Sequence, residues 1–157
     1  MIVNLQRKIK IKTADFMPFL VALEAGVEEV KGKHFSVAFV SDDRMWRLNW
    51  SFRGNDSTTD VLSFPHEPDE FEISPAAGFT ADGELPAEGG SQHFLGDIVI
   101  SVDQAARQAK ENNLTLSAEI KQLILHGVLH LCGYDHETDD GEMNARELEL
   151  RARLGID

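Results

Sequence analysis

The sequence has one cysteine, few prolines and no long apolar run. The single cysteine, Cys132, excludes a disulfide within the chain and fits a reducing compartment, where a thiol can pack in a core without being oxidised. No stretch reaches the roughly 18 consecutive apolar residues that a membrane span needs, and residues 1–15 lack the apolar centre of a secretory signal. We therefore expect a cytoplasmic protein.

Positively charged residues are scarce, with 15 lysines and arginines against 27 acidic residues and a net charge of -12. This balance argues against binding to nucleic acid, because contacts to phosphate depend on lysine and arginine. The distribution weakens the argument, since residues 1–60 hold nine basic against eight acidic residues, while residues 61–157 hold six against nineteen. The basic residues gather in the first third of the chain: residues 7–12, Arg44, Arg47 and Arg53.

The length of 157 residues suits one ordinary domain, and we expect residues 1–157 to form a single α/β (α+β) domain. Segments rich in β-branched and aromatic residues predict a small, mainly four-stranded sheet from residues 2–6, 34–40, 61–64 and 97–101. Apolar spacing of three to four residues predicts surrounding helices at residues 17–30, 42–50, 101–113, 117–132 and 137–154. The segment 65–94 is rich in proline, glycine and acidic residues, which predicts a surface loop.

The segment HGVLHLCGYDH predicts a metal site. His126 and His130 are four residues apart, so both imidazoles lie on one face of a helix, about 6 Å apart. Gly133 is a natural helix stop, after which His136 can return as a third ligand. Three histidines leave a tetrahedral zinc ion one open position, where water is acidified to a pKa near 7. We expect one zinc ion per chain.

The same spacing occurs in metzincin peptidases, which have the pattern H-E-x-x-H-x-x-G-x-x-H. Gly127 stands where those enzymes have their general-base glutamate, which disfavours a zinc peptidase. Met143 is interpreted as a core residue of the last helix rather than as a counterpart of the metzincin methionine turn. Asp135 is either a partner of a histidine ligand or a capping residue. Cys132 should face away from the two helical histidines and pack in the core.

Three blocks of sequence in the same order resemble the YbeY family of bacterial rRNA-maturation endoribonucleases: HGVLHLCGYDH, NWSFRGNDSTTDVLSFP and LGDIVIS. The resemblance implies a zinc-dependent, single-strand endoribonuclease that acts on the 3' end of precursor 16S rRNA and in ribosome quality control, with a metzincin-like zinc site. It places the zinc ligands at His126, His130 and His136 and the functional arginine at Arg53. Its implied partners are precursor rRNA and components of the ribosome or its small subunit. Two departures are Ser57-Thr58-Thr59, where the family usually has a proline, and a longer segment at residues 65–94.

Arg53 is suited to phosphate chemistry, because a guanidinium contacts two phosphoryl oxygens at once and stabilises developing charge. A surface salt bridge is the alternative role for this side chain. Trp46 and Trp50 could stack on bases, although packing in the core is the more common role. For the whole protein, two alternatives to the ribonuclease stay open: a zinc peptidase, and a non-catalytic ribosome-assembly factor whose zinc only stabilises the fold. Either zinc-bound hydroxide or the ribose 2'-hydroxyl could be the nucleophile.

Overall fold

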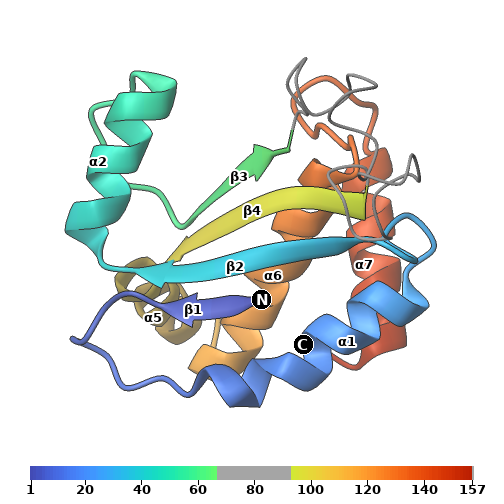
Figure 1. Ribbon diagram of the computed structural model, residues 1–157, viewed down its shortest axis with the longest axis horizontal. Helices are drawn as coiled ribbons and strands as arrows, with labels where there is room; N and C mark the ends of the chain where they lie inside the picture. The colour runs from blue at the N-terminus through green and yellow to red at the C-terminus, as the bar shows by residue number, and fades with distance from the viewer. Residues whose placement is uncertain (67–92, 157) are drawn as a thin grey trace, which may run out of the picture.

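The computed structural model describes residues 1–66 and 93–156 and has the predicted α/β (α+β) architecture, a four-stranded sheet with surrounding helices (Figure 1). The elements in chain order are β1 (Ile2–Asn4), the 3-10 helix η1 (Thr13–Phe16), α1 (Met17–Gly26), β2 (His34–Val40), α2 (Asp42–Arg53), β3 (Val61–Pro65), β4 (Phe94–Ser101), α5 (Val102–Glu111), α6 (Leu116–Leu131) and α7 (Glu142–Leu154). All four strands predicted from the sequence are present.

The sheet is mixed, with the strand order β1-β2-β4-β3. Strand β2 pairs in parallel with β1 and with β4, whereas β3 pairs with β4 in antiparallel fashion. The antiparallel edge strand β3 is the next element after α2, to which it is joined by residues 54–60 (Figure 1).

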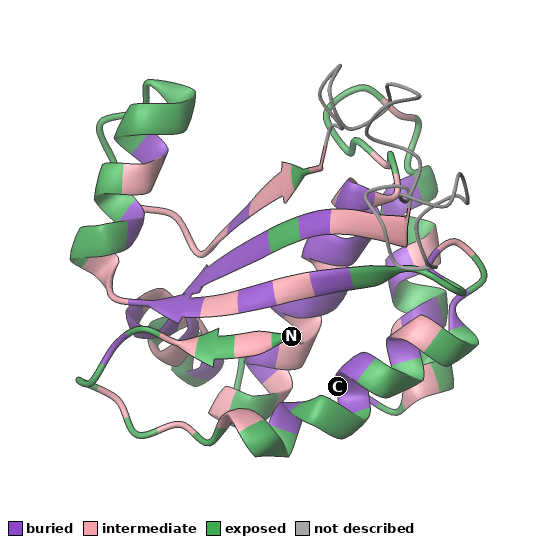
Figure 2. Ribbon diagram, in the orientation of Figure 1, coloured by how far each residue is buried: buried purple, intermediate pink, exposed green. Residues whose placement is uncertain are grey.

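The two faces of the sheet are covered differently. Ile98 and Ile100 of β4 join the main core with Phe35 of β2 and apolar residues of α1, α5, α6 and α7. Val99, which points to the opposite face because side chains alternate along a strand, packs in a small second core with Met45 of α2. Figure 2 shows buried residues along β2, β4 and α6, whereas α2 is largely exposed. Helix α2 is therefore an outlying element on the thinly covered face.

Three helix boundaries differ from the sequence prediction by three residues or more. Helix α1 ends at Gly26 rather than at residue 30, because Val27 adopts an extended backbone. The apolar spacing continues to Val30 because the turn after the helix also packs in the core. Helix α2 continues beyond residue 50 to Arg53. Helix α7 begins at Glu142 rather than at residue 137, because Gly141 precedes it with a φ of 104°.

The loop predicted at residues 65–94 overlaps a strand by one residue at each end, because Pro65 is the last residue of β3 and Phe94 is the first residue of β4. Residues 67–92 lie outside the described residues. Within the described ranges, the structure contains no helix that is both long and apolar enough to span a membrane.

Candidate metal centre and catalytic cleft

Helix α6 and the turn after it bring the three predicted histidines together. Thr115 caps the start of the helix by accepting a hydrogen bond from the backbone of Ala118 (3.1 Å). Beyond the other end, Gly133 adopts a φ of 101°, which lets the chain turn back. His126, His130 and His136 each offer a ring nitrogen, and these three atoms lie within 4.8 Å of one another. The group can hold a metal ion.

The partners of two imidazoles determine which nitrogen faces the centre of the group. Nδ1 of His130 lies 3.0 Å from the carbonyl oxygen of Tyr134, which can only accept, so Nδ1 carries the proton. Nδ1 of His126 lies 3.5 Å from a carboxylate oxygen of Glu147 and is protonated for the same reason. In the neutral rings both Nε2 atoms then carry lone pairs, and these atoms lie 3.2 Å apart. Two facing lone pairs repel unless a cation lies between them.

The separation of two of the three ligand nitrogens fits a tetrahedral zinc ion. With Zn–N bonds of about 2.0–2.1 Å, tetrahedral geometry separates two ligand nitrogens by about 3.3 Å. The separation between Nε2 of His126 and Nε2 of His130 is 3.2 Å. Imidazole nitrogen is also a donor that zinc accepts readily, although copper, iron and nickel accept it as well. Geometry and donor type therefore suit zinc without excluding these other metals.

Burial and neighbouring charges favour a neutral ring of His130, which can bind a metal. Burial lowers the pKa of His130, and the positive charges that His126 and His136 can carry lower it further. Burial alone would raise the pKa of Glu147, but its hydrogen bond to His126 and the charges of His126 and Arg151 outweigh burial and lower it. Glu147 is thus an anion beside the three histidines at neutral pH.

A second set of contacts holds the turn that carries His136. The hydroxyl of Tyr134 donates to Glu29 (2.9 Å), and Arg146 of α7 donates to the same carboxylate (2.7 Å). The hydrogen bond from Arg146 lowers the pKa of Glu29 to about 2. Tyr134 also supplies the carbonyl oxygen beside His130. Glu29 and Arg146 therefore hold Tyr134 in place, and the carbonyl oxygen of Tyr134 orients His130.

Gly127 is required by the packing of α6 on the sheet. A Cβ atom at this position would lie 2.9 Å from Cγ2 of Ile98, closer than real contacts allow. The hydroxyl of Ser63 on β3 also donates to the carbonyl oxygen of Gly127 (3.2 Å). A side chain at the position where metzincins have their catalytic glutamate would therefore force Ile98 to shift.

Arg53 and the three histidines line one cleft with a volume of about 790 Å³. Helix α2 ends directly after Arg53, because Gly54 adopts a φ of 69°. One helical turn earlier, the buried Asn49 donates to the carbonyl oxygen of Ser57 (2.9 Å) and holds the following turn against the helix. Phe52 packs edge to face on Phe64 of β3, with 5.2 Å between ring centroids. Arg53 is thereby placed at the exposed end of α2, where it forms part of the lining of the histidine cleft.

A family model described as Endoribonuclease YbeY matches residues 1–155. The chain belongs to the YbeY family of endoribonucleases. The Endoribonuclease YbeY of Nautilia profundicola is 40% identical over 124 residues, which cover 79% of this chain and 74% of the relative. That of Geobacillus thermodenitrificans is 38% identical over 141 residues, 87% of this chain and 83% of the relative. The solution structure of TM1509 from Thermotoga maritima matches with a TM-score of 0.55 and 30% identity, covering 95% of this chain and 85% of that one.

The three sequence blocks that resemble the YbeY family meet around this cleft. Residues 49–65 form the end of α2, the following turn and β3, which together supply one wall. Residues 126–136 supply the histidines of the opposite wall. Residues 95–101 form most of β4, which lies beneath Gly127 and pairs with β3. The predicted family is confirmed, and its motifs coincide in space.

The YbeY resemblance did not identify every residue around the histidines. Glu147, which contacts His126, was missed because it lies on another helix with no fixed spacing from the histidine motif. The carbonyl oxygen of Tyr134, which contacts His130, was missed because a backbone group leaves no signal in the residue types of the motif. Asp135 caps no helix, because α7 begins only at Glu142; its carboxylate accepts a hydrogen bond from the backbone of Glu137 (3.0 Å) within the turn.

Other side chains resolve the remaining sequence alternatives. Met143 is buried in the main core, as expected. The thiol of Cys132 lies 3.7 Å from the carbonyl oxygen of Glu29, and burial raises its pKa to about 11. The expectation that Trp46 and Trp50 pack in the core is wrong, because both are exposed.

Proposed function

We propose that the protein is a zinc-dependent, single-strand endoribonuclease that cleaves phosphodiester bonds in precursor rRNA. Membership in the YbeY family of endoribonucleases supports the reaction class. The finer assignment comprises maturation of the 16S rRNA 3' end and ribosome quality control in the cytoplasm, with the ribosome or its small subunit as partner. It rests on the motifs around His126, His130, His136 and Arg53.

The observation that carries the proposal is the 3.2 Å separation between Nε2 of His126 and Nε2 of His130, both of which line an open cleft. The lone pairs of these two nitrogens repel each other, and a cation bound between them would remove the repulsion. His136 would provide the third nitrogen, and a zinc ion held by the three histidines would supply Lewis-acid chemistry beside the cleft. We assign one zinc ion per chain to these residues.

The remaining residues of the cleft fit a phosphodiester substrate. The exposed guanidinium of Arg53 binds two phosphoryl oxygens and stabilises the charge that develops on them during cleavage. The hydroxyl of Ser63 is already engaged with the carbonyl oxygen of Gly127, so it is not placed as a nucleophile. Glu147 and the carbonyl oxygen of Tyr134 orient their histidines through Nδ1.

Both alternative functions fit these observations less well. A zinc peptidase of the metzincin type lacks its general base, and a side chain in place of Gly127 would force Ile98 to shift. A purely structural zinc site is closed by four protein ligands. The nearest candidate for a fourth ligand, Cys132, instead contacts the backbone of Glu29.

The deciding experiment incubates purified protein with a single-stranded RNA and with a duplex of the same length, in the presence and absence of a chelator. We expect cleavage of the single strand, loss of cleavage on chelation and recovery with added zinc. His130→Ala should lose both zinc and cleavage, because it removes the central ligand. Full zinc content in this variant would contradict the ligand assignment, and cutting of casein with sparing of RNA would support the peptidase.

A further inference from the structure

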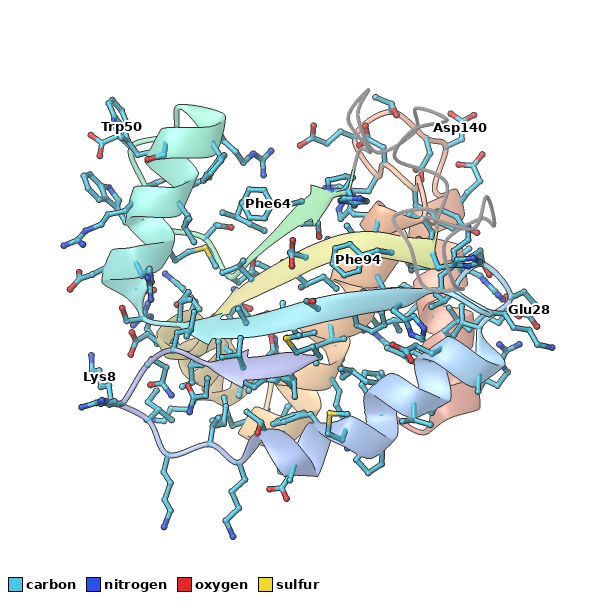
Figure 3. All side chains as sticks on the ribbon, viewed as in Figure 1. Lys8, Glu28, Trp50, Phe64, Phe94 and Asp140 are labelled. Atoms are coloured by element: carbon cyan, nitrogen blue, oxygen red, sulfur yellow. The ribbon has the colours of Figure 1, made fainter. Side chains whose placement is uncertain are left out.

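Both tryptophans of the chain lie on α2 and are exposed to solvent. The exposed fractions are 42% for Trp46 and 54% for Trp50, although a buried indole stabilises a fold far more than an exposed one. Figure 3 shows Trp50 on the outer side of α2, pointing away from the strands. The indole N–H of Trp46 donates to the carboxylate of Asp56 (2.9 Å), which holds this ring in place on the surface. The packing of the fold does not account for these two side chains.

The two tryptophans and Arg53 form a stripe on one face of α2. Their spacing is four residues and then three, and such positions lie next to one another along a helix. Arg53 is also part of the lining of the histidine cleft. The stripe therefore begins on the free surface of the helix and ends at the rim of the cleft.

The chemistry of this stripe matches unpaired nucleotides. Planar aromatic side chains stack on bases of any identity, and a guanidinium contacts the phosphate backbone or stacks on a base. In a chain with a net charge of -12, the segment up to residue 60 is the one in which basic residues balance acidic ones. Bases in a duplex are already stacked on each other and leave no free face for an indole. The surface thus favours single strands.

We propose that Trp46, Trp50 and Arg53 form a base-stacking site for the single-stranded RNA next to the bond that is cleaved. This proposal rests on the proposed ribonuclease function and assigns to it a substrate-binding surface that extends from the rim of the histidine cleft along α2. The site also provides a physical reason for selecting single strands over duplexes.

Alanine substitution of a stacked aromatic residue costs about 1–3 kcal/mol per base, or roughly 5- to 150-fold in affinity. Exposed rings lie at the low end of this range, so Trp50→Ala should weaken binding of single-stranded RNA by roughly 5- to 20-fold. Leu148→Ala on α7 is the matched control, since it removes an apolar side chain of similar exposure, 53%. Both changes are at the surface, so melting temperatures should stay close to that of the parent protein.

Tryptophan fluorescence reports on this site directly, because the chain has no other tryptophans. The protein is titrated with oligouridylate and with an RNA duplex of equal length, using Trp46→Phe and Trp50→Phe to separate the two signals. We expect the single strand to quench both indoles and the duplex to quench them much less. Equal quenching by both RNAs, or no quenching at RNA concentrations that saturate cleavage, would overturn the proposal.

The two proposals fail in different ways. Quenching and RNA affinity are measured on His130→Ala, which retains the stripe but lacks a zinc ligand. Quenching by this variant supports the stacking site even if the parent protein cleaves no RNA. Conversely, if the parent cleaves RNA while Trp50→Ala binds single strands as tightly as Leu148→Ala, the stacking site is refuted and the ribonuclease function stands.

Discussion

Replacing Glu147 by glutamine tests whether this residue orients the metal centre. Both carboxylate oxygens lie near Nδ1 of His126, at 3.4 and 3.5 Å, and the side chain is nearly buried. Glutamine keeps the size of the side chain and one acceptor oxygen but removes the negative charge. The change therefore weakens the proton acceptor of His126 without opening a cavity beside it.

The expected size of the effect follows from these distances. Loss of a hydrogen-bonding partner of a metal ligand typically lowers metal affinity by about 10- to 100-fold. The contact of Glu147 with His126 is at the long end of hydrogen-bond distances, so Glu147→Gln should lower zinc affinity by about 10-fold. Glu147→Ala leaves Nδ1 without this acceptor and should approach the upper end, about 100-fold.

Zinc affinity is measured at pH 7.5 by competition with a chromophoric chelator, and the fold is checked by thermal melting without metal. Glu149→Gln is the control, because this residue is two positions further along α7, is 61% exposed and pairs with Arg146 instead of a histidine. Equal zinc affinities in Glu147→Gln and Glu149→Gln would refute the orienting role.

Three further outcomes are expected. Arg53→Ala should keep its zinc and its melting temperature but lose RNA cleavage by about 10- to 1000-fold, and Arg53→Lys should recover little because an ammonium cannot make the two-pronged contact. Gly127→Ala should lower the free energy of unfolding by about 1–2 kcal/mol in urea titrations, because the new Cβ meets Ile98 at 2.9 Å. The pKa of Glu29 is lowered to about 2 by Arg146, so its stabilising effect is complete above pH 4.5 and is lost as the pH falls toward 2. Glu29→Gln should therefore flatten the acid limb of the stability curve.

Each of these variants has a control in the same chain. Arg44→Ala removes an arginine from the same helix outside the cleft lining, and an equal loss of cleavage in both arginine variants would contradict a specific role for Arg53. Gly26→Ala adds a methyl group where no atom lies within 4 Å, so it should not destabilise the fold. An unchanged acid limb in Glu29→Gln would show that other carboxylates dominate acid unfolding.

The sequence alone determined the features that depend on local spacing. Alternating and β-branched segments predicted four strands, and three-to-four spacing predicted the helices, because both patterns reflect which side of an element is buried. The pair His126 and His130 was predictable for the same reason, since one helical turn fixes their separation. The glycine at position 133 was recognisable as the turn that returns His136.

Only the tertiary structure decided which distant residues surround these histidines. Glu147 reaches His126 from another helix, and Glu29 reaches Tyr134 across more than one hundred residues of chain. Such contacts have no characteristic spacing, because they depend on how whole elements pack against one another. Sequence spacing likewise could not show that α2 lies on the thinly covered face of the sheet, which leaves Trp46 and Trp50 exposed. Local periodicity thus determined the elements and the metal motif, and packing between the elements determined their surroundings.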